Sequence, residues 1–255
     1  LFPDTSYGCE SGGDPKNIPD LTYENFLNFH RTYYHPSNSY IYLYGNMDME
    51  EKLAFLDEHY LSHFDYLDVD SVIQEQKAFG ACQDVTLEYP VAENEGEEDN
   101  TYLSYNMVVG NAADSQMAMA FEVLDYALLS APGAPLKQAL LDVKAGKDVY
   151  GSYDDGILQP YFTVIAKGSN PDRKEEFVSV IRQVLGDIVK NGIDKKAVEA
   201  GINYFEFRYR EADFSSYPKG LMYSLDILGD WLYEKGNPFA QVQQLTVFEN
   251  LKKAV

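Results

Sequence analysis

The chain has 255 residues, of which 45% are hydrophobic and 24% are charged, as in an ordinary soluble globular protein. This composition excludes disordered and collagen-like classes, and two cysteines, Cys9 and Cys82, are too few for a disulfide scaffold. The formal net charge of −21 opposes binding to nucleic acid or to an anionic membrane surface, so neither is expected as a partner.

The cysteine count also bears on the compartment. Both cysteines are expected to be free thiols in a reducing compartment, taken to be cytoplasmic, or an organelle matrix if the source is a eukaryote. No apolar run approaches the roughly 18–20 residues that span a bilayer. Residues 1–5 carry no targeting signal, because they lack a basic region and an apolar run.

Acidic residues are concentrated in the first part of the chain. Residues 1–100 hold 21 acidic and four basic side chains. The densest acidic run, residues 93–99, contains five carboxylates and no cation, so like-charge repulsion favours an exposed loop. The alternative for this loop is the electrostatic steering of basic ligands.

The first predicted elements are a loop, a helix and a strand. Residues 1–20 are rich in glycine, proline and aspartate, which predicts an ordered loop that other parts of the protein must hold. A helix is predicted from Thr22, as its N-cap, to the break at Pro36. The aromatic and aliphatic residues 40–44 then predict a strand.

A second helix completes this region. It is predicted to begin at Asp48, with Glu51 in the position of a capping box, and to reach about Phe64. One loop, two helices and one strand are too few to close a core. Residues 1–66 are therefore interpreted as the C-terminal part of an incomplete domain.

One complete domain is predicted over residues 84–240. Residues 67–83 are interpreted as the linker that precedes it, and residues 241–255 as the start of an interdomain linker. Strands are predicted over residues 85–89, 102–109, 147–154 and 158–167. The first two flank the acidic loop as a hairpin, and the last two join at Asp155-Gly156, a dipeptide suited to a tight turn with positive φ.

Helices are predicted between and after these strands. One begins at Asp114 and reaches about Ser130, and another begins after Asn170-Pro171, an N-cap followed by proline, and ends at Gly192. Further helices are predicted over residues 136–143, 194–212 and 218–234. This order predicts an α+β fold with an antiparallel or mixed sheet and helices packed on one of its faces.

Short motifs near the N-terminus resemble a known family. Residues 2–8, 11–21 and 30–38 resemble, in that order, the segment after the zinc site in the insulinase/pitrilysin family of zinc metallopeptidases. The similarity is greatest to its presequence-protease-like subfamily. Residues 135–141 and 217–220 are more loosely similar to the second domain of that family.

The resemblance implies a zinc metalloendopeptidase that degrades unfolded peptides in a closed chamber. Four related α/β domains form that chamber in the family. The first carries a His-x-x-Glu-His motif, in which two histidines bind zinc and the glutamate is the general base. The fold implied for this chain is the end of that zinc-site domain followed by the second, non-catalytic domain.

The motif itself is absent from this sequence. The only histidines four residues apart are His59 and His63, and Ser62 stands where the family has its glutamate. Two polar residues on an exposed helix face are the simpler interpretation, with an adventitious metal site as the alternative. We therefore assign no catalytic, cofactor-binding or metal-binding residue, and we expect zinc only in the parent protein.

One loop is a candidate neighbour of the active site. Gly12, Gly13, Asp14 and Pro15 resemble the family's loop that leaves the active-site region, where glycine permits unusual backbone angles. The alternative is a turn without substrate contact.

The predicted function is therefore that of one segment of a zinc metalloendopeptidase. Alone it is expected to be inactive. Its partners are expected to be unfolded, basic peptide substrates and the missing domains of the same protein, and exposed strand edges predict self-association of the isolated chain. The alternatives are a non-catalytic scaffold or peptide-binding relative of the same superfamily, and an unrelated α+β binding module.

Overall fold

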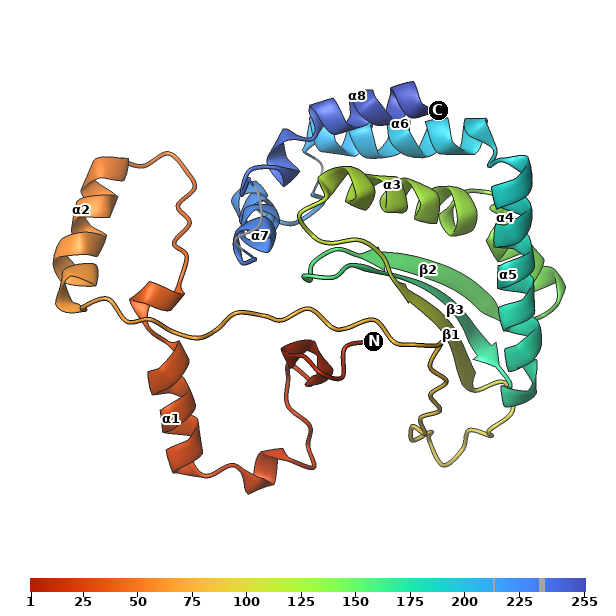
Figure 1. The fold of residues 1–255 in the computed structure, drawn as a ribbon, viewed down its shortest axis with the longest axis horizontal. Coiled ribbons are helices and arrows are strands. Elements are labelled where there is room, and N and C mark those ends of the chain that lie inside the picture. The colour runs from red at the N-terminus through yellow and green to blue at the C-terminus, as the bar shows by residue number, and fades with distance from the viewer. Residues whose placement is uncertain (213, 234–236) are drawn as a thin grey trace.

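The computed structural model describes residues 1–212, 214–233 and 237–255. Within these residues the strands form one antiparallel sheet in the order β1-β3-β2 (Figure 1). The strands are β1 (Thr101–Val108), β2 (Asp148–Asp154) and β3 (Tyr161–Ser169). Val164 of the central strand lies opposite Tyr105 of β1 and Gly151 of β2. Side chains alternate between the two faces of a strand, so one face carries the buried residues Phe162, Val164 and Ala166.

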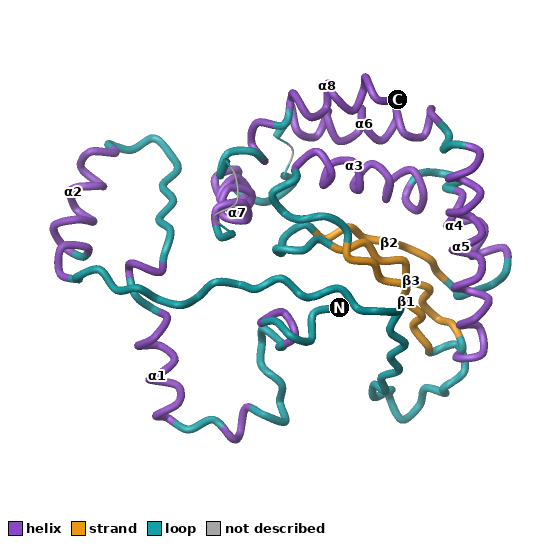
Figure 2. The backbone as a smooth tube through the Cα atoms, viewed as in Figure 1, coloured by secondary structure: helices purple, strands orange, loops and turns teal. Residues whose placement is uncertain are grey.

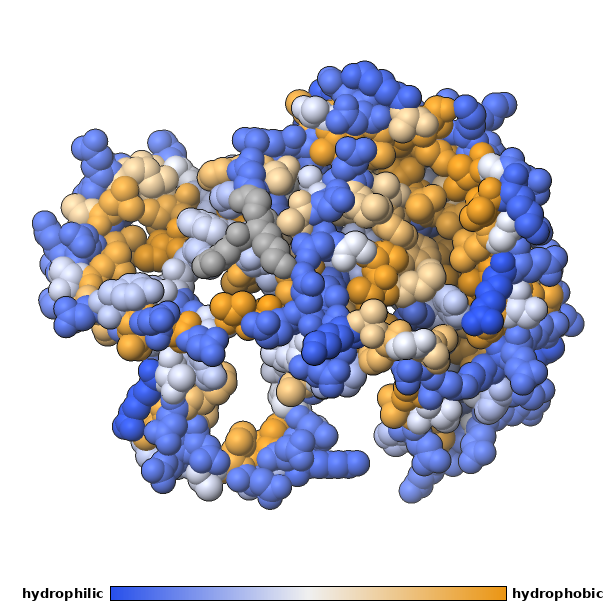
Figure 3. All heavy atoms as spheres, in the orientation of Figure 1, coloured by the Kyte–Doolittle hydropathy of each residue, from blue (hydrophilic) through white to orange (hydrophobic). Residues whose placement is uncertain are grey.

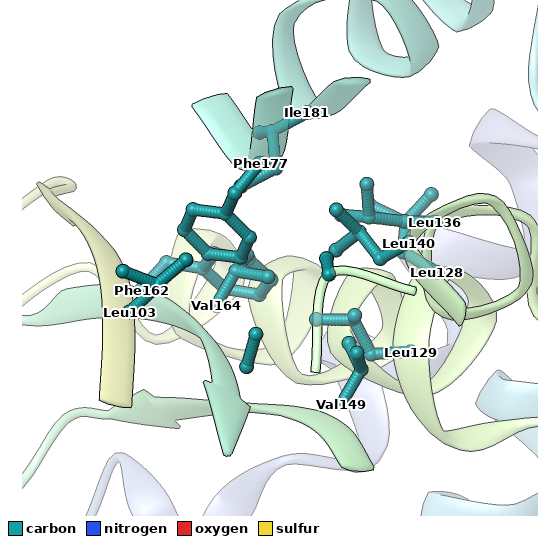
Figure 4. Packing of buried hydrophobic residues seen from close by; sticks show 12 residues of the cluster. Leu103, Leu128, Leu129, Leu136, Leu140, Val149, Phe162, Val164, Phe177 and Ile181 are labelled. Atoms are coloured by element: carbon teal, nitrogen blue, oxygen red, sulfur yellow. The ribbon is translucent and has the colours of Figure 1, made fainter. Parts of the chain in front are cut away.

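Three helices cover that buried face (Figures 1 and 4). They are α3 (Ser115–Asp125), α4 (Pro135–Asp142) and α5 (Lys174–Asn191). A π-helical turn, Tyr126–Ser130, follows α3 directly. The core joins side chains of the strands, this turn, α4 and α5, and its buried members include Leu103, Leu129, Leu136, Leu140, Val149, Val164, Phe177 and Ile181.

A second helical layer packs on the far side of α3. It consists of α6 (Lys195–Glu211) and α8 (Leu245–Ala254), which lie side by side in Figure 2. Met119 and Val123 of α3 meet Val198 and Ile202 of α6 around Phe248 of α8. Helix α7 (Lys219–Trp231) connects these two helices.

The sheet and helices α3 to α8 lie within residues 101–255, which we call the sheet domain. The first 100 residues form an extended N-terminal arm beside it (Figure 1). The arm carries α1 (Tyr23–Tyr33) and α2 (Met49–His59), and neither of these described helices has a buried residue. Figure 3 shows apolar side chains gathered on the surface around α2. Large exposed apolar side chains of the arm include Tyr23, Phe26, Phe29, Leu53, Phe55, Val85 and Leu87.

Polar contacts of Tyr7 and Gln76 help attach the arm to the sheet domain. The hydroxyl groups of Tyr7 and Tyr233 share a hydrogen bond of 2.5 Å. Gln76, which is 7% exposed, accepts the Asp4 N–H at 2.9 Å through Oε1, and its own N–H donates to Oε1 of Gln159 at 2.6 Å. Tyr7 thus finds a partner just after α7, and Gln76 finds one on the loop between β2 and β3.

Many predicted elements are confirmed. The side chain of Thr22 accepts the Asn25 N–H at 3.1 Å, and that of Asp48 accepts the Glu51 N–H at 3.0 Å, so both N-caps are present. Gly192 ends α5 with φ of 86°, a backbone angle that favours glycine. The strands predicted over 102–109 and 147–154 correspond to β1 and β2, and the α+β class is confirmed.

The strand predicted over residues 40–44 is wrong, because the described structure there is irregular. The tyrosines of this segment pack on α7 instead. The rings of Tyr40 and Trp231 lie 4.5 Å apart, and those of Tyr44 and Tyr223 lie 6.0 Å apart. A strand needs a neighbouring strand to satisfy its backbone groups, and here the neighbour is a helix.

The hairpin predicted from residues 85–89 and β1 is also wrong. Residues 85–89 are irregular and exposed, and Tyr89 alone approaches the strand, with its ring 5.9 Å from that of Tyr102. The acidic loop is tied elsewhere, because Asp99 accepts the side-chain amide of Asn170 at 2.7 Å and pairs with Lys147 at 3.3 Å. Those two contacts join the end of the loop to the residues just before β2 and α5.

The turn between β2 and β3 is longer than predicted. Strand β3 begins at Tyr161 rather than at residue 158, and neither Asp155 nor Gly156 has a positive φ. Leu158 is buried and its carbonyl accepts the Ala112 N–H at 3.0 Å. Burial of this leucine keeps residues 155–160 as a broad loop.

Two helix ends differ from the prediction as well. Asn170 makes no capping hydrogen bond, because its side-chain oxygen accepts the Asp99 N–H at 2.9 Å instead. Helix α5 begins at Lys174 after a 3-10 turn. Helix α2 ends at His59 instead of continuing to Phe64.

Residues 241–255, expected as the start of a linker, contain α8, whose Phe248 is buried against α3 and α6. The helix predicted over 218–234 corresponds to α7, and residue 234 lies outside the described residues.

Candidate functional site

The predicted active-site-adjacent loop forms a local turn. Gly13 has φ of 83°, and the side chain of Asp14 accepts the Lys16 N–H at 2.8 Å. The Asp14 carbonyl accepts the N–H groups of Asn17 and Ile18 at 2.9 and 3.0 Å. Gly12, Asp14 and Pro15 are exposed. A role beside an active site stays a prediction for this loop.

The histidines do not form a metal centre. His59 is the last residue of α2, whereas His63 belongs to a separate 3-10 turn, so the pair does not share one continuous helix. The ring of His30 stacks on Tyr34 at 4.7 Å, and Nδ1 of His35 accepts the Ser37 N–H at 3.2 Å. Among the described residues, no group of three or more His, Cys, Asp or Glu side chains is arranged to hold a metal ion.

The described residues form a pocket of about 660 Å³. It lies where the end of α6, the middle of α7 and the segment before α8 meet residue 42 of the arm. We call it the tyrosine pocket, and its lining is Tyr42, Tyr209, Arg210, Ala212, Phe214, Tyr223, Asp226, Ile227, Phe239, Val242 and Leu245. This volume lies in the range of small-molecule and side-chain binding sites.

The local backbone explains why the pocket forms. Ala212 ends α6 in a left-handed conformation, with φ of 47° and ψ of 48°, which turns the chain sharply away from the helix. The Tyr209 hydroxyl donates to the Val242 carbonyl at 2.6 Å and accepts the Gln244 N–H at 3.2 Å. That hydroxyl thus fixes the opposite wall against α6.

The charged lining groups differ in their partners. Arg210 donates through Nε and Nη2 to Oε1 of Glu206, at 2.9 and 2.7 Å. Asp226 is half-buried, and no cation or hydrogen-bond donor among the described residues pairs with its carboxylate. Burial, together with the charges of Asp155 and Asp230, raises the pKa of Asp226 to about 6.

Further carboxylates lie behind the pocket. Burial, followed by the charge of Asp155, raises the pKa of Glu122 on α3 to about 7, while Arg208 opposes the shift. Burial also raises the pKa of Asp125, whose Oδ1 atom is buried without a hydrogen-bond partner. At neutral pH Glu122 is therefore only partly ionised.

Sequence reasoning did not find this pocket. Its residues come from four separate segments and form no motif, and the segments meet only through the packing of α6, α7 and α8. The one available signal was the abundance of aromatic residues, with 21 tyrosines and 14 phenylalanines.

Comparison with known proteins places the fold. Residues 20–205 match the family model described as the Peptidase M16 inactive domain. The chain belongs to the M16 peptidase family. The predicted resemblance to presequence-protease-like peptidases is thereby confirmed. The matched range includes much of the arm and the sheet domain up to α6, whereas most of the tyrosine pocket lies beyond it.

Individual M16 relatives agree with this placement. The chain is 46% identical over 255 residues to Protein HypA of Clostridium perfringens, covering 100% of this chain and 26% of that protein. It is 34% identical over 259 residues to Presequence protease 1, chloroplastic/mitochondrial, of Arabidopsis thaliana, covering 100% of this chain and 24% of that protein. The chain thus spans about a quarter of the length of these curated relatives.

A solved M16 structure shares the fold. The peptidase M16 inactive domain from Pseudomonas fluorescens superposes with a TM-score of 0.59 at 20% identity, covering 100% of this chain and 58% of that chain. Across the part of the chain that the structure describes, no helix is long and apolar enough to cross a membrane.

Proposed function

We propose that this chain is a non-catalytic segment of a zinc-dependent metalloendopeptidase. In the whole protein it forms part of the wall of a closed chamber in which unfolded peptides are degraded, while another segment binds the zinc. The match of residues 20–205 to an inactive peptidase domain carries this proposal.

The sheet supports a peptide-facing role. Helices cover one of its faces, and the opposite face carries Tyr102, Ser104 and Asn106 of β1 and Tyr150 and Ser152 of β2. Tyr102 and Tyr150 are exposed, so hydroxyl and amide groups of this face are open to a ligand. Strand β1 is also an edge of the described sheet, where an extended peptide can pair with free backbone groups.

The arm supports a role inside a larger protein. Helices α1 and α2 bury no side chain in this chain, although both carry large apolar residues. We propose that the remaining domains of the same protein cover these residues. In their absence the isolated chain is expected to self-associate. A monodisperse monomer by light scattering would contradict that expectation.

The charge of the chain bears on the substrate. With a net charge of −21, it attracts basic peptides and repels acidic ones as they approach. We propose basic, unfolded peptides as the favoured substrates and a reducing compartment, the cytoplasm or an organelle matrix, as the location.

The test compares the longer protein that contains this segment with the 255-residue chain alone. The expected result is about one zinc per longer chain and chelator-sensitive cleavage of an unstructured basic peptide, with neither property in the segment. A longer protein that binds no zinc and cleaves nothing would favour the alternative of a scaffold or peptide-binding relative.

A further inference from the structure

We propose that the tyrosine pocket binds an arginine side chain of a peptide held by this protein. The proposal rests on the proposed function only in that a peptide supplies the arginine. It adds a defined site, on the side of the sheet domain where α6, α7 and residue 42 of the arm meet.

The aromatic lining suits a planar cation. Tyr223 lines the pocket, with the ring of Phe214 5.3 Å away and nearly perpendicular, at 89°. Tyr42 reaches the same pocket from the arm, where its ring stacks on Tyr44 at 6.3 Å. A guanidinium group is flat and weakly hydrated, so it stacks on aromatic faces and gains from their negative π surfaces.

One carboxylate in this lining has no partner. Asp226 is half-buried and, among the described residues, receives neither an ion pair nor a hydrogen bond. A carboxylate held among aromatic and aliphatic groups is unfavourable unless a cation or donor reaches it. Arginine supplies both, because its N–H groups match the two carboxylate oxygens.

The surrounding charges favour the same ligand. Asp155 and Asp230 both act electrostatically on Asp226, and both are negative. Among the described lining residues the cation is Arg210, which already donates two hydrogen bonds to Glu206. An anionic ligand would meet Asp226, and a neutral apolar ligand would leave that carboxylate unpaired.

The size of the pocket allows more than a guanidinium group. At about 660 Å³ it admits a whole arginine side chain with part of the adjoining peptide backbone. The Tyr209 hydroxyl is already hydrogen-bonded, so the hydroxyl groups of Tyr42 and Tyr223 are the ones that face that peptide backbone.

The test is a titration of the ¹⁵N-labelled 255-residue chain, followed by NMR. The probe is a blocked pentapeptide with a central arginine between alanines, and its matched control carries citrulline, which has the same shape without the charge. The arginine peptide is expected to shift the amide signals of residues 223–227 and 239–245 in a saturable manner. The citrulline peptide is expected to bind at least about tenfold more weakly, as the loss of a charge-assisted hydrogen bond predicts.

Variants of the chain locate the site. Asp226→Asn is expected to weaken arginine-peptide binding about tenfold. Asp187→Asn, which removes the same charge from an exposed position on α5, is expected to change it less than about twofold. Tyr223→Leu provides a second variant that removes the aromatic surface and keeps the charge, and it is also expected to weaken binding. Circular dichroism shows which variants fold.

Several results would overturn the proposal. They are equal affinity for the arginine and citrulline peptides, equal effects of Asp226→Asn and Asp187→Asn, or shifts confined to other residues. Because binding to this chain requires no catalysis, a longer protein without zinc or cleavage would contradict the proposed function and leave the pocket unaffected. Cleavage by the longer protein without arginine binding here would contradict the pocket alone.

Discussion

The sheet domain and the N-terminal arm use similar helices with different results. In the sheet domain Leu136 and Leu140 of α4 and Ile181 of α5 are completely buried. In the arm Phe26 of α1 is 65% exposed and Phe55 of α2 is 58% exposed. Both regions have capped helices with apolar residues at helical spacing. The apolar pattern therefore determines that a helix forms, whereas burial depends on whether a second surface is present.

The largest expected effect tests this comparison directly. Leu140→Ala removes a fully buried side chain of the core and is expected to lower the free energy of unfolding by about 2–5 kcal/mol. Phe26→Ala in the exposed part of α1 is expected to change it by less than about 0.5 kcal/mol. Urea denaturation of both variants measures the difference. Equal losses would mean that the arm buries α1 in solution, for example through self-association.

A half-buried carboxylate of the sheet domain gives the next effect. The pKa of Glu122 is raised from 4.5 to about 7, so its ionised form is disfavoured in the folded state. Below pH 4.5 the group is protonated in both states, and as the pH rises through 7 the folded state loses stability. Glu122→Gln is therefore expected to match the parent chain near pH 4 and to be more stable by up to about 3 kcal/mol at pH 8.

Thermal or urea unfolding at several pH values measures this dependence. The groups that act on Glu122 are Asp155, Asp125 and Asp226, which raise its pKa, and Arg208, which lowers it. Asp187→Asn on the exposed side of α5 serves as the control and is expected to show no such trend. A gain that is independent of pH would contradict the electrostatic explanation.

The attachment of the arm predicts a smaller and more local effect. Gln76→Ala removes the side chain that accepts the Asp4 N–H and donates to the Asp4 carboxylate at 2.7 Å. The expected loss is about 1–3 kcal/mol in the local stability of residues 1–8, seen as faster amide hydrogen exchange there. The exchange of β3 and α5 is expected to stay unchanged. Gln83→Ala, at an exposed position of the arm, is the matched control.

Two glycines of the sheet domain provide the smallest effects, with opposite signs. Gly192 ends α5 with φ of 86°, so Gly192→Ala is expected to destabilise the chain by about 1 kcal/mol. Gly186 lies within α5, where an added Cβ meets nothing within 4 Å, so Gly186→Ala is expected to stabilise it by about 0.5–1 kcal/mol. Unfolding curves that show the same sign for both would contradict the assigned helix end.

The elements that the sequence predicted well depend on near neighbours in the chain. The caps at Thr22 and Asp48 and the end of α5 at Gly192 each involve groups within a few residues. The family resemblance likewise rested on short ordered motifs, and the match of residues 20–205 confirms it.

The elements that the sequence predicted badly depend on distant partners. Residues 40–44 and 85–89 have strand-like composition, yet neither has a strand beside it to complete its hydrogen bonds. Helix α8 is stable because Phe248 finds a site between α3 and α6.

The sequence by itself determined the caps at Thr22 and Asp48, the end of α5 at Gly192 and the family. The tertiary structure alone decided which apolar faces are buried, which strand-like segments pair, and how Tyr42, Tyr223 and Asp226 come to line one pocket. The physical reason is the distance along the chain over which each interaction acts. Capping and periodicity act over a few residues along the chain, whereas burial, sheet pairing and the pKa of a carboxylate depend on groups that only folding brings together.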